Sequence, residues 1–129
     1  MSFHITLTTT DATIEKSNNN NNHSLKLHFT KPIRLHGEWE VAIVNWISDD
    51  DAKRLVWIFC DFVNYSLINN IPMQFLGIEN DTSSSSKPMY IKVCKKMFSN
   101  INIQIKHSPL AQELVKVKNF TCILHFRKA

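Results

Sequence analysis

The chain has 129 residues, of which 43% are hydrophobic, and this predicts a single domain over residues 1–129 with a core large enough to stabilise it. Glycine occurs only at Gly37 and Gly77, which excludes glycine-rich phosphate loops and dinucleotide-binding fingerprints. The net charge of +4 is uneven, because residues 1–86 carry six basic and ten acidic side chains, whereas residues 87–129 carry nine basic side chains against Glu113 alone.

The N-terminal strand is predicted at Phe3 to Thr9, where Phe3, Ile5 and Leu7 alternate with polar residues. This alternation leaves no apolar run of the kind found in secretory signal peptides. No run in the chain reaches the length of a transmembrane helix, so we expect no membrane association.

The next two predicted elements are a polar loop and a second strand. The loop spans residues 10–23 and includes the run Asn18 to Asn22. The strand spans Ser24 to Thr30, and we expect it to stop at Lys31-Pro32 because proline cannot donate a ladder hydrogen bond.

The third and fourth predicted strands, Trp39 to Trp46 and Leu55 to Val63, carry apolar residues on both faces. Two such strands have more apolar surface than one small domain needs, so their second faces are predicted to meet another subunit or a covering loop. The residues predicted to form this self-association surface are Val44, Trp46, Trp57 and Phe59. For the two tryptophans, an ordinary place in the core is the alternative.

Four further strands are predicted from alternating patterns that end at turn residues. They span residues 73–78, 89–94, 100–106 and 119–127, and Ser108-Pro109 is expected to open a short helical turn that reaches Leu114. About eight short strands predict an all-β fold, a β-sandwich that is jelly-roll-like.

The three cysteines are Cys60, Cys94 and Cys122, an odd number with no Cys-x-x-Cys spacing. They are predicted to be reduced thiols of an intracellular protein, and the absence of paired spacing disfavours a zinc site. The run Asp49-Asp50-Asp51 is predicted to be a turn, since adjacent carboxylates diverge too far to chelate a cation without further donors.

Candidate catalytic and metal-binding sets are weak. His4, His28 and His125 occupy outward strand positions and would converge on a metal only if their strands were neighbours. A catalytic triad could be named from Asp61, Ser66 and His107, but no serine of the chain stands in a nucleophile motif. We therefore predict a protein that is not an enzyme and needs no cofactor or metal.

The basic C-terminal region has three interpretations, which are a solvated face, a contact with an acidic neighbour such as another copy, and contact with DNA. In strands 100–106 and 119–127 the outward positions offer no ring for base stacking except His125, so the pattern favours a generic electrostatic surface. The lysines of a nucleic-acid-binding or DNA-condensing module would be Lys92, Lys95, Lys96, Lys106, Lys116 and Lys118.

Three stretches of the chain carry a resemblance. The first joins Phe3-His4-Ile5-Thr6-Leu7 to Lys31-Pro32-Ile33-Arg34-Leu35-His36-Gly37-Glu38-Trp39-Glu40-Val41-Ala42-Ile43. The second is Ile58-Phe59-Cys60-Asp61-Phe62-Val63. The third comprises Tyr90-Ile91-Lys92-Val93, then Phe98 to Ile105, and closes with Leu124-His125-Phe126-Arg127-Lys128. Together they resemble a family encoded by Polinton/Maverick elements and adintoviruses, the large virus-like DNA transposons of animals. The Gly-Glu-Trp-Glu-Val and Leu-His-Phe-Arg pieces are its more specific parts.

This resemblance implies a virion structural protein of the minor capsid or penton-like type, from such an element or from a copy domesticated by a host. Its partners would be further copies of itself and other capsid proteins, around DNA. It would be found in the virion and, before assembly, in the host nucleus or cytoplasm. An adaptor that docks a protein partner along a sheet edge is a third function that the sequence leaves open.

Overall fold

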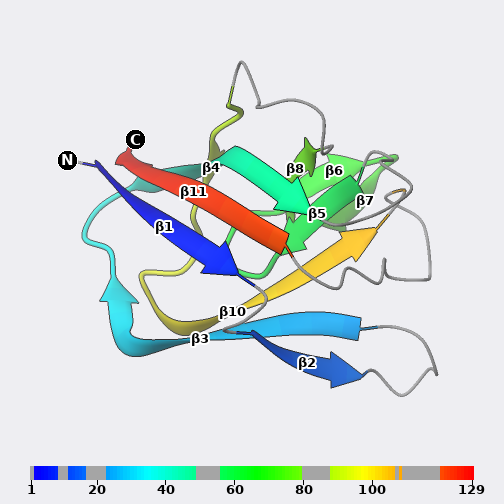
Figure 1. Ribbon diagram of the computed structural model, residues 1–129. Coiled ribbons are helices and arrows are strands. Elements are labelled where there is room, and N and C mark those ends of the chain that lie inside the picture. Colours follow the sequence, from blue (N-terminus) through cyan, green and yellow to red (C-terminus); the bar gives the residue numbers. More distant parts are fainter. Residues whose placement is uncertain are drawn as a thin grey trace.

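A computed structural model describes residues 2–8, 12–16, 23–48, 56–79, 88–106, 108 and 120–129. These ranges form two main antiparallel sheets and a separate hairpin, which confirms the predicted all-β sandwich (Figure 1). The strands are β1 (Ser2–Thr8), β2 (Ala12–Lys16), β3 (His23–Arg34), β4 (Trp39–Ser48), β5 (Val56–Cys60), β6 (Ser66–Ile68), β7 (Ile71–Met73), β8 (Phe75–Glu79), β9 (Ile91–Lys92), β10 (Met97–Lys106) and β11 (Phe120–Lys128).

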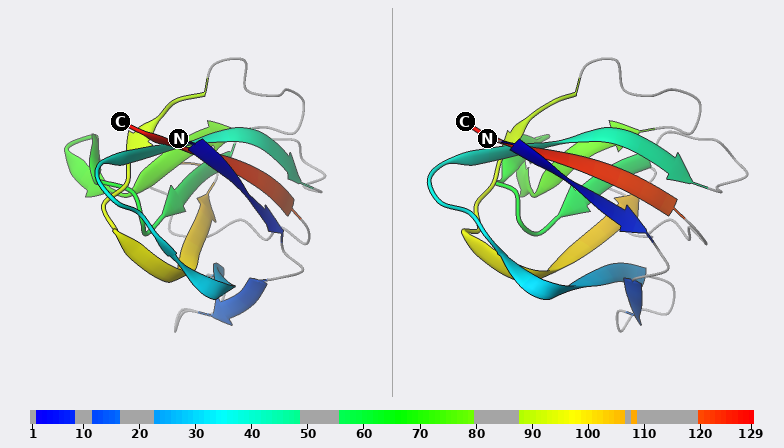
Figure 2. Two further views of the ribbon diagram at one scale, coloured as in Figure 1. Left: turned by 90° about the vertical axis from the view of Figure 1, so that its left-hand side faces the viewer. Right: turned by 60° about the vertical axis from the view of Figure 1, so that its left-hand side comes forward.

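The strand order is that of a jelly roll. One sheet has the order β1-β11-β4-β9, and the other has the order β2-β3-β10-β5-β8. Four pairs are nested along the chain, namely β1 with β11, β3 with β10, β4 with β9, and β5 with β8. Successive pairs alternate between the two sheets, so the chain is one long antiparallel hairpin rolled into a sandwich. The nesting brings the two chain ends side by side, as Figures 1 and 2 show.

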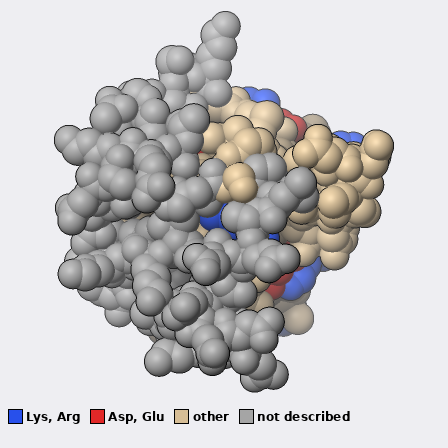
Figure 3. All heavy atoms as spheres, turned by 90° about the vertical axis from the view of Figure 1, so that its right-hand side faces the viewer, with Lys and Arg blue, Asp and Glu red and all other residues tan. Residues whose placement is uncertain are grey.

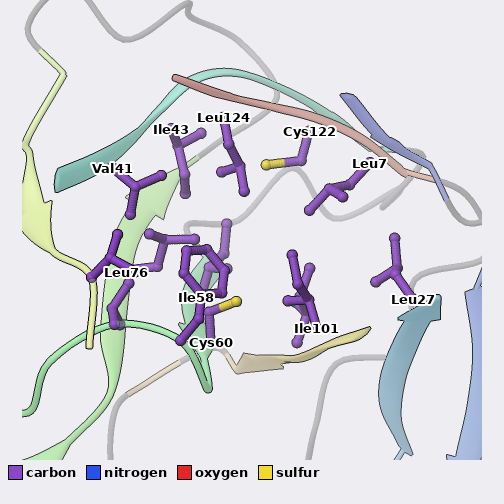
Figure 4. Close-up of a cluster of buried hydrophobic side chains, with 14 of the residues drawn as sticks. Leu7, Leu27, Val41, Ile43, Ile58, Cys60, Leu76, Ile101, Cys122 and Leu124 are labelled. Carbon is purple, nitrogen blue, oxygen red and sulfur yellow. The ribbon is translucent and has the colours of Figure 1, made fainter. Parts of the chain in front are cut away.

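The core lies between the two sheets. In Figure 4, Cys122 and Leu124 of β11 face Ile58 and Cys60 of β5 across the sandwich. One end of the core is aromatic, because the ring of Phe62 stacks on that of Phe126 at a centroid distance of 5.7 Å. The predicted alternation of β11 is confirmed, since its inward residues Phe120, Cys122, Leu124 and Phe126 are all buried.

A β-bulge explains why the sequence of β4 is apolar on both faces. Ile123 of β11 pairs with Asn45, whereas Leu124 pairs with Ile43, which leaves Val44 as the extra residue. The bulge shifts the alternation by one position, so Trp46 joins Ile43 on the inward face. Trp46 is 3% exposed, and its ring stacks on Phe120 at a centroid distance of 5.0 Å.

Two predictions for the N-terminal third of the chain are wrong. Strand β2 forms within the predicted loop and pairs with the first half of β3. Strand β3 continues through Pro32 instead of ending at Thr30. The ladder with β10 is irregular there, because Ile33 pairs with Phe98 and the next pair along the ladder is His28 with Asn100. A proline is tolerated in such an irregular stretch, where no regular ladder donor is required.

Several predicted strands are shorter in the structure. The strand predicted over residues 55–63 ends at Cys60, and Asp61 and Phe62 form a turn before an isolated bridge between Val63 and Val93. The strand predicted at 89–94 is reduced to β9, which has two residues.

The β6–β7 hairpin was not predicted. Its two-residue turn consists of Asn69 and Asn70, with φ angles of 50° and 63°. Two consecutive residues at positive φ are typical of a type I′ turn, and asparagine tolerates this conformation better than most residues.

Two predicted elements lie mostly outside the described ranges, namely the aspartate turn at 48–53 and the helical turn at 108–114. Within the described ranges, no helix has the length and apolarity needed to cross a membrane.

Candidate functional site: the β6–β7 hairpin and the sheet face beside it

The β6–β7 hairpin lies within an uncharged stretch of the chain. No charged residue occurs between Asp61 and Glu79, although one residue in five of the whole chain is charged. Four of the seven strongly exposed large hydrophobic residues of the described ranges belong to this stretch: Tyr65, Leu67, Ile71 and Ile78. The hairpin projects from the sandwich in the left view of Figure 2, and the right part of Figure 3 is mostly tan, with charged atoms at its borders.

Leu67 is the most exposed of these side chains, at 72%, and it pairs with Pro72 across the hairpin. The exposure is a consequence of position, because β6 and β7 pair only with each other and belong to neither main sheet. Contiguous exposed apolar side chains of this kind are a common mark of contact surfaces.

Aromatic rings cover the outer face of β5, next to the hairpin. Trp57 and Phe59 are two residues apart and therefore point to the same side of the sheet. The ring of Phe75 lies 5.1 Å from that of Trp57 and 5.7 Å from that of Phe59, centroid to centroid. Phe75 belongs to β8, which pairs with β5 in the same sheet, so the three rings lie side by side across two neighbouring strands.

A hollow of about 340 Å³ lies between this sheet face and the hairpin. Its sheet side includes Phe59, Asn102, Gln104 and Lys106, and its hairpin side includes Tyr65, Pro72, Met73 and Gln74. In the second half of β10 the inward residues are Ile101, Ile103 and Ile105. The polar side chains that alternate with them, Asn102, Gln104 and Lys106, therefore face the hollow's side of the sheet. The volume is near the lower end of the range of small-molecule sites.

Asp61 organises one edge of the hollow. Its carboxylate accepts hydrogen bonds from the backbone N–H of Asn102 at 3.1 Å and from Asn102 Nδ2 at 3.3 Å, and it pairs with Lys95 Nζ at 3.2 Å. Gln74 Nε2 donates to the backbone oxygens of Asp61 and Val63. These contacts hold the turn after β5 against β10 and compensate the negative charge of Asp61.

The residues predicted for self-association are only partly available in the single chain. Trp46 is in the core at 3% exposure and Phe59 is 7% exposed, so the expectation that they supply a free apolar surface is corrected. Trp57 and Val44 are half-buried. The physical reasons are the bulge in β4, which turns Trp46 inward, and the packing of the Phe59 ring against Phe75 of the neighbouring strand.

The four predicted nucleic-acid lysines that the structure describes do not form one track. Lys96 pairs with Glu38 at 3.6 Å, Lys95 pairs with Asp61, and Lys92 lies on β9 of the other sheet. Lys106 Nζ lies 5.3 Å from the ring centroid of Phe59, above the hollow. Lys116 and Lys118 are outside the described ranges.

Aromatic and basic side chains also meet on the outer face of the four-stranded sheet. The rings of His4 and His125 stack at a centroid distance of 4.6 Å, Tyr90 Oη lies 2.7 Å from His125 Nδ1, and the Arg127 guanidinium lies 3.5 Å from the Tyr90 ring centroid. Partial burial, followed by the nearby His4 and Arg127, lowers the pKa of His125.

The predicted histidine set is only partly brought together. His28 lies on β3 in the other sheet, away from His4 and His125. Among the described residues, no group of three or more His, Cys, Asp or Glu side chains is placed to hold a metal ion.

The other groups considered for chemistry are the candidate triad and the three cysteines. In the candidate triad, the Asp61 carboxylate is bound by Lys95 and Asn102, and His107 is outside the described ranges. All three cysteines are free thiols, with Cys60 and Cys122 buried and Cys94 exposed.

The hairpin was the main feature that sequence reasoning missed. A usable signal was present, because Asn69-Asn70 separates two short apolar runs by two residues, the spacing of a tight hairpin. The hollow had no comparable signal, since it depends on which strands are neighbours.

Comparison of the chain with protein-family models, with curated proteins and with solved structures gives no match.

Proposed function

We propose that this protein is a non-enzymatic structural subunit of a virion, of the minor capsid or penton-like type, that works by associating with copies of itself. Its partners in this role are other capsid proteins as well as further copies, and its location is the virion and, before assembly, the host cell. The jelly-roll fold and the three family-like stretches support this proposal. Because one fold can serve many functions, the proposal also needs a specific surface feature of this chain.

The observation that carries the proposal is the uncharged β6–β7 hairpin. It holds Leu67 and Ile71 away from both sheets, where they contribute little to the core of one subunit. Removing such apolar side chains from water stabilises a contact by about 25 cal/mol per Å² of buried area. A second copy supplies the same uncharged patch, which is the self-complementary arrangement of a two-fold interface.

The test is the mass of the full chain in solution, measured by size-exclusion chromatography with light scattering over a range of concentrations. We expect an oligomer whose fraction rises with concentration, and we expect Leu67→Ser to shift it towards monomer. Met97→Ser is the matched control, because Met97 is also exposed, at 57%, but lies at the start of β10 outside the hairpin.

Two results would contradict the proposal. One is a monomer at every concentration for the unmodified chain. The other is an oligomer that Met97→Ser weakens as much as Leu67→Ser does, because the hairpin would then have no special part in the contact.

A further inference from the structure

The hollow beside the hairpin combines rings and amides. Phe59 forms part of its sheet side, and Tyr65, which is 67% exposed, stands on its hairpin side. Trp57 continues the row of rings along β5 beyond the hollow. The structure therefore places aromatic side chains on the face that carries the outward residues of β10, a combination that alternation along single strands did not predict.

One of the two amides beside these rings has hydrogen-bonding capacity to spare. Asn102 Nδ2 is used on Asp61, and Asn102 Oδ1 is enclosed and has no partner within the described structure. Because Oδ1 is closed to solvent, Asn102 shapes the wall of the hollow and does not supply a free group to a ligand. Gln104 lines the same hollow from an exposed position on β10 and offers both a donor and an acceptor.

Positive charge borders the hollow without a matching excess of negative charge. Lys106 lines it and forms no ion pair with any described residue. Lys95, which pairs with Asp61 at the edge of the hollow, keeps a side chain that is 42% exposed. Asp61 is the acidic residue lining the hollow, and its carboxylate is already bound by Lys95 and Asn102.

We propose that this hollow binds one base of a single-stranded nucleic acid, with Tyr65 against the face of the base, the amide of Gln104 at its edge, and Lys106 near the adjoining phosphate. Rings that stack on bases and lysines that follow the phosphates are the two components of single-strand recognition. This function is additional to the proposed structural role in the virion. It uses Tyr65, which precedes β6, whereas the proposed self-association uses Leu67 and Ile71 of the hairpin.

A single strand fits this site better than a duplex does. A base inside a duplex is stacked and paired, so it reaches a hollow only after it has been extruded. A free nucleotide fits the hollow but lacks the neighbouring phosphates of a strand, which would extend towards Lys95. Both a single strand and a free nucleotide supply the base, and their affinities for the chain distinguish the two ligands.

The experiment measures the fluorescence anisotropy of a labelled oligothymidylate with the full chain, at several salt concentrations. We expect binding that weakens with salt, a duplex of equal length that binds less tightly, and thymidine monophosphate that competes only at far higher concentration. Tyr65→Ala should raise Kd by roughly 5-fold or more, because stacking contributes about 1–3 kcal/mol per base, whereas Tyr65→Phe should stay close to the unmodified chain. Lys106→Ala should lower the slope of log K against log salt by about 0.7, the value for one phosphate of a single strand.

Lys96→Ala is the matched control, because it removes an exposed lysine that pairs with Glu38 and does not line the hollow. If Tyr65→Ala and Lys106→Ala bind no worse than this control, binding is a diffuse charge effect and the proposed site is wrong. Equal affinity for the duplex would overturn it too, and so would the absence of binding at low salt. All of these changes are at surface positions, and light scattering of each variant checks that its oligomeric state matches that of the unmodified chain.

Discussion

At the scale of single residues, Glu79 is the clearest departure from an ordinary surface carboxylate. It is the last residue of β8, and it is 8% exposed. Burial disfavours the charged form and raises the pKa of Glu79 from 4.5 to about 6. The folded chain therefore holds this proton over a pH range in which the unfolded chain has released it.

This shift predicts a specific pH dependence of stability. Because the folded state binds the Glu79 proton more tightly, the free energy of unfolding falls as pH rises from about 4.5 to about 6, the interval between the ordinary and folded pKa values. Glu79→Gln should remove that dependence and stabilise the chain near neutral pH by about 1 kcal/mol, since β8 is an edge strand where water screens part of the charge. Urea denaturation at a series of pH values measures both effects.

The control for this prediction is Glu38→Gln, which changes an exposed carboxylate paired with Lys96. It removes the same charge from an exposed position, so an effect of net charge alone appears in this variant as well. A stabilisation by Glu38→Gln equal to that by Glu79→Gln would show that net charge, and not the burial of Glu79, is responsible.

For His125 we predict a pH dependence of stability with the opposite sign. Burial first, and then His4 and Arg127, lower its pKa, so the folded state favours the neutral ring and stability falls as pH drops through the usual histidine range. His4→Asn removes the stacked neighbour and should raise the pKa of His125 towards its ordinary value. NMR titration of the histidine ring protons measures this directly, and an unchanged His125 titration would refute the coupling.

At the scale of elements, the turn of the β6–β7 hairpin depends on its two asparagines. Asn70 has a φ of 63°, in the left-handed region where glycine is favoured and branched residues are strained. Asn70→Gly should keep the hairpin, whereas Asn70→Val should weaken it by about 1–2 kcal/mol. Amide hydrogen exchange of Ile68 and Ile71 reports on this hairpin locally, and equal protection in the two variants would contradict the turn assignment.

The elements also show which parts of the fold the sequence could predict. Strands with one inward face, such as β1 and β11, were predicted within about one residue because alternation alone defines them. β4 was located well, but its second apolar face was misinterpreted, since a bulge at Val44 adds one residue without leaving any local signal. β2 and β9 are short edge strands, whose pairing depends on distant neighbours more than on their own composition.

The candidate site was harder to predict than the fold for the same reason. Trp57 and Lys106 were each singled out, but they are 49 positions apart in the chain, and the sequence did not reveal that they pair across β5 and β10. Tyr65 was not singled out at all, because its importance follows from a hairpin that was missed. Sites built on the face of a sheet require the strand order, which single-strand patterns do not contain.

At the scale of the whole molecule, the nested pairing makes the two sheets one cooperative unit. β1 pairs with β11 and β3 with β10, so strands from opposite ends of the chain complete both sheets. Separating the sheets breaks contacts along the full length of the chain, and local openings that expose the core should be rare. The thiols of Cys60 and Cys122 are suited to test this, because Figure 4 shows both side chains in the space between the sheets.

We expect one of the three thiols to react quickly with a thiol reagent and the other two to react only as fast as the whole domain unfolds. Cys94 is exposed, whereas Cys60 is 2% exposed and Cys122 is 1% exposed. Burial, with smaller effects of Asp61 and Glu79 respectively, raises the pKa of the Cys60 and Cys122 thiols, so the reactive thiolate is scarce as well as shielded. Cys94→Ser should abolish the fast phase. Because Cys60 and Cys122 come from opposite sheets, a common slow rate for the two would show that the sheets separate in one step, and a faster rate at either one would show that its sheet opens alone.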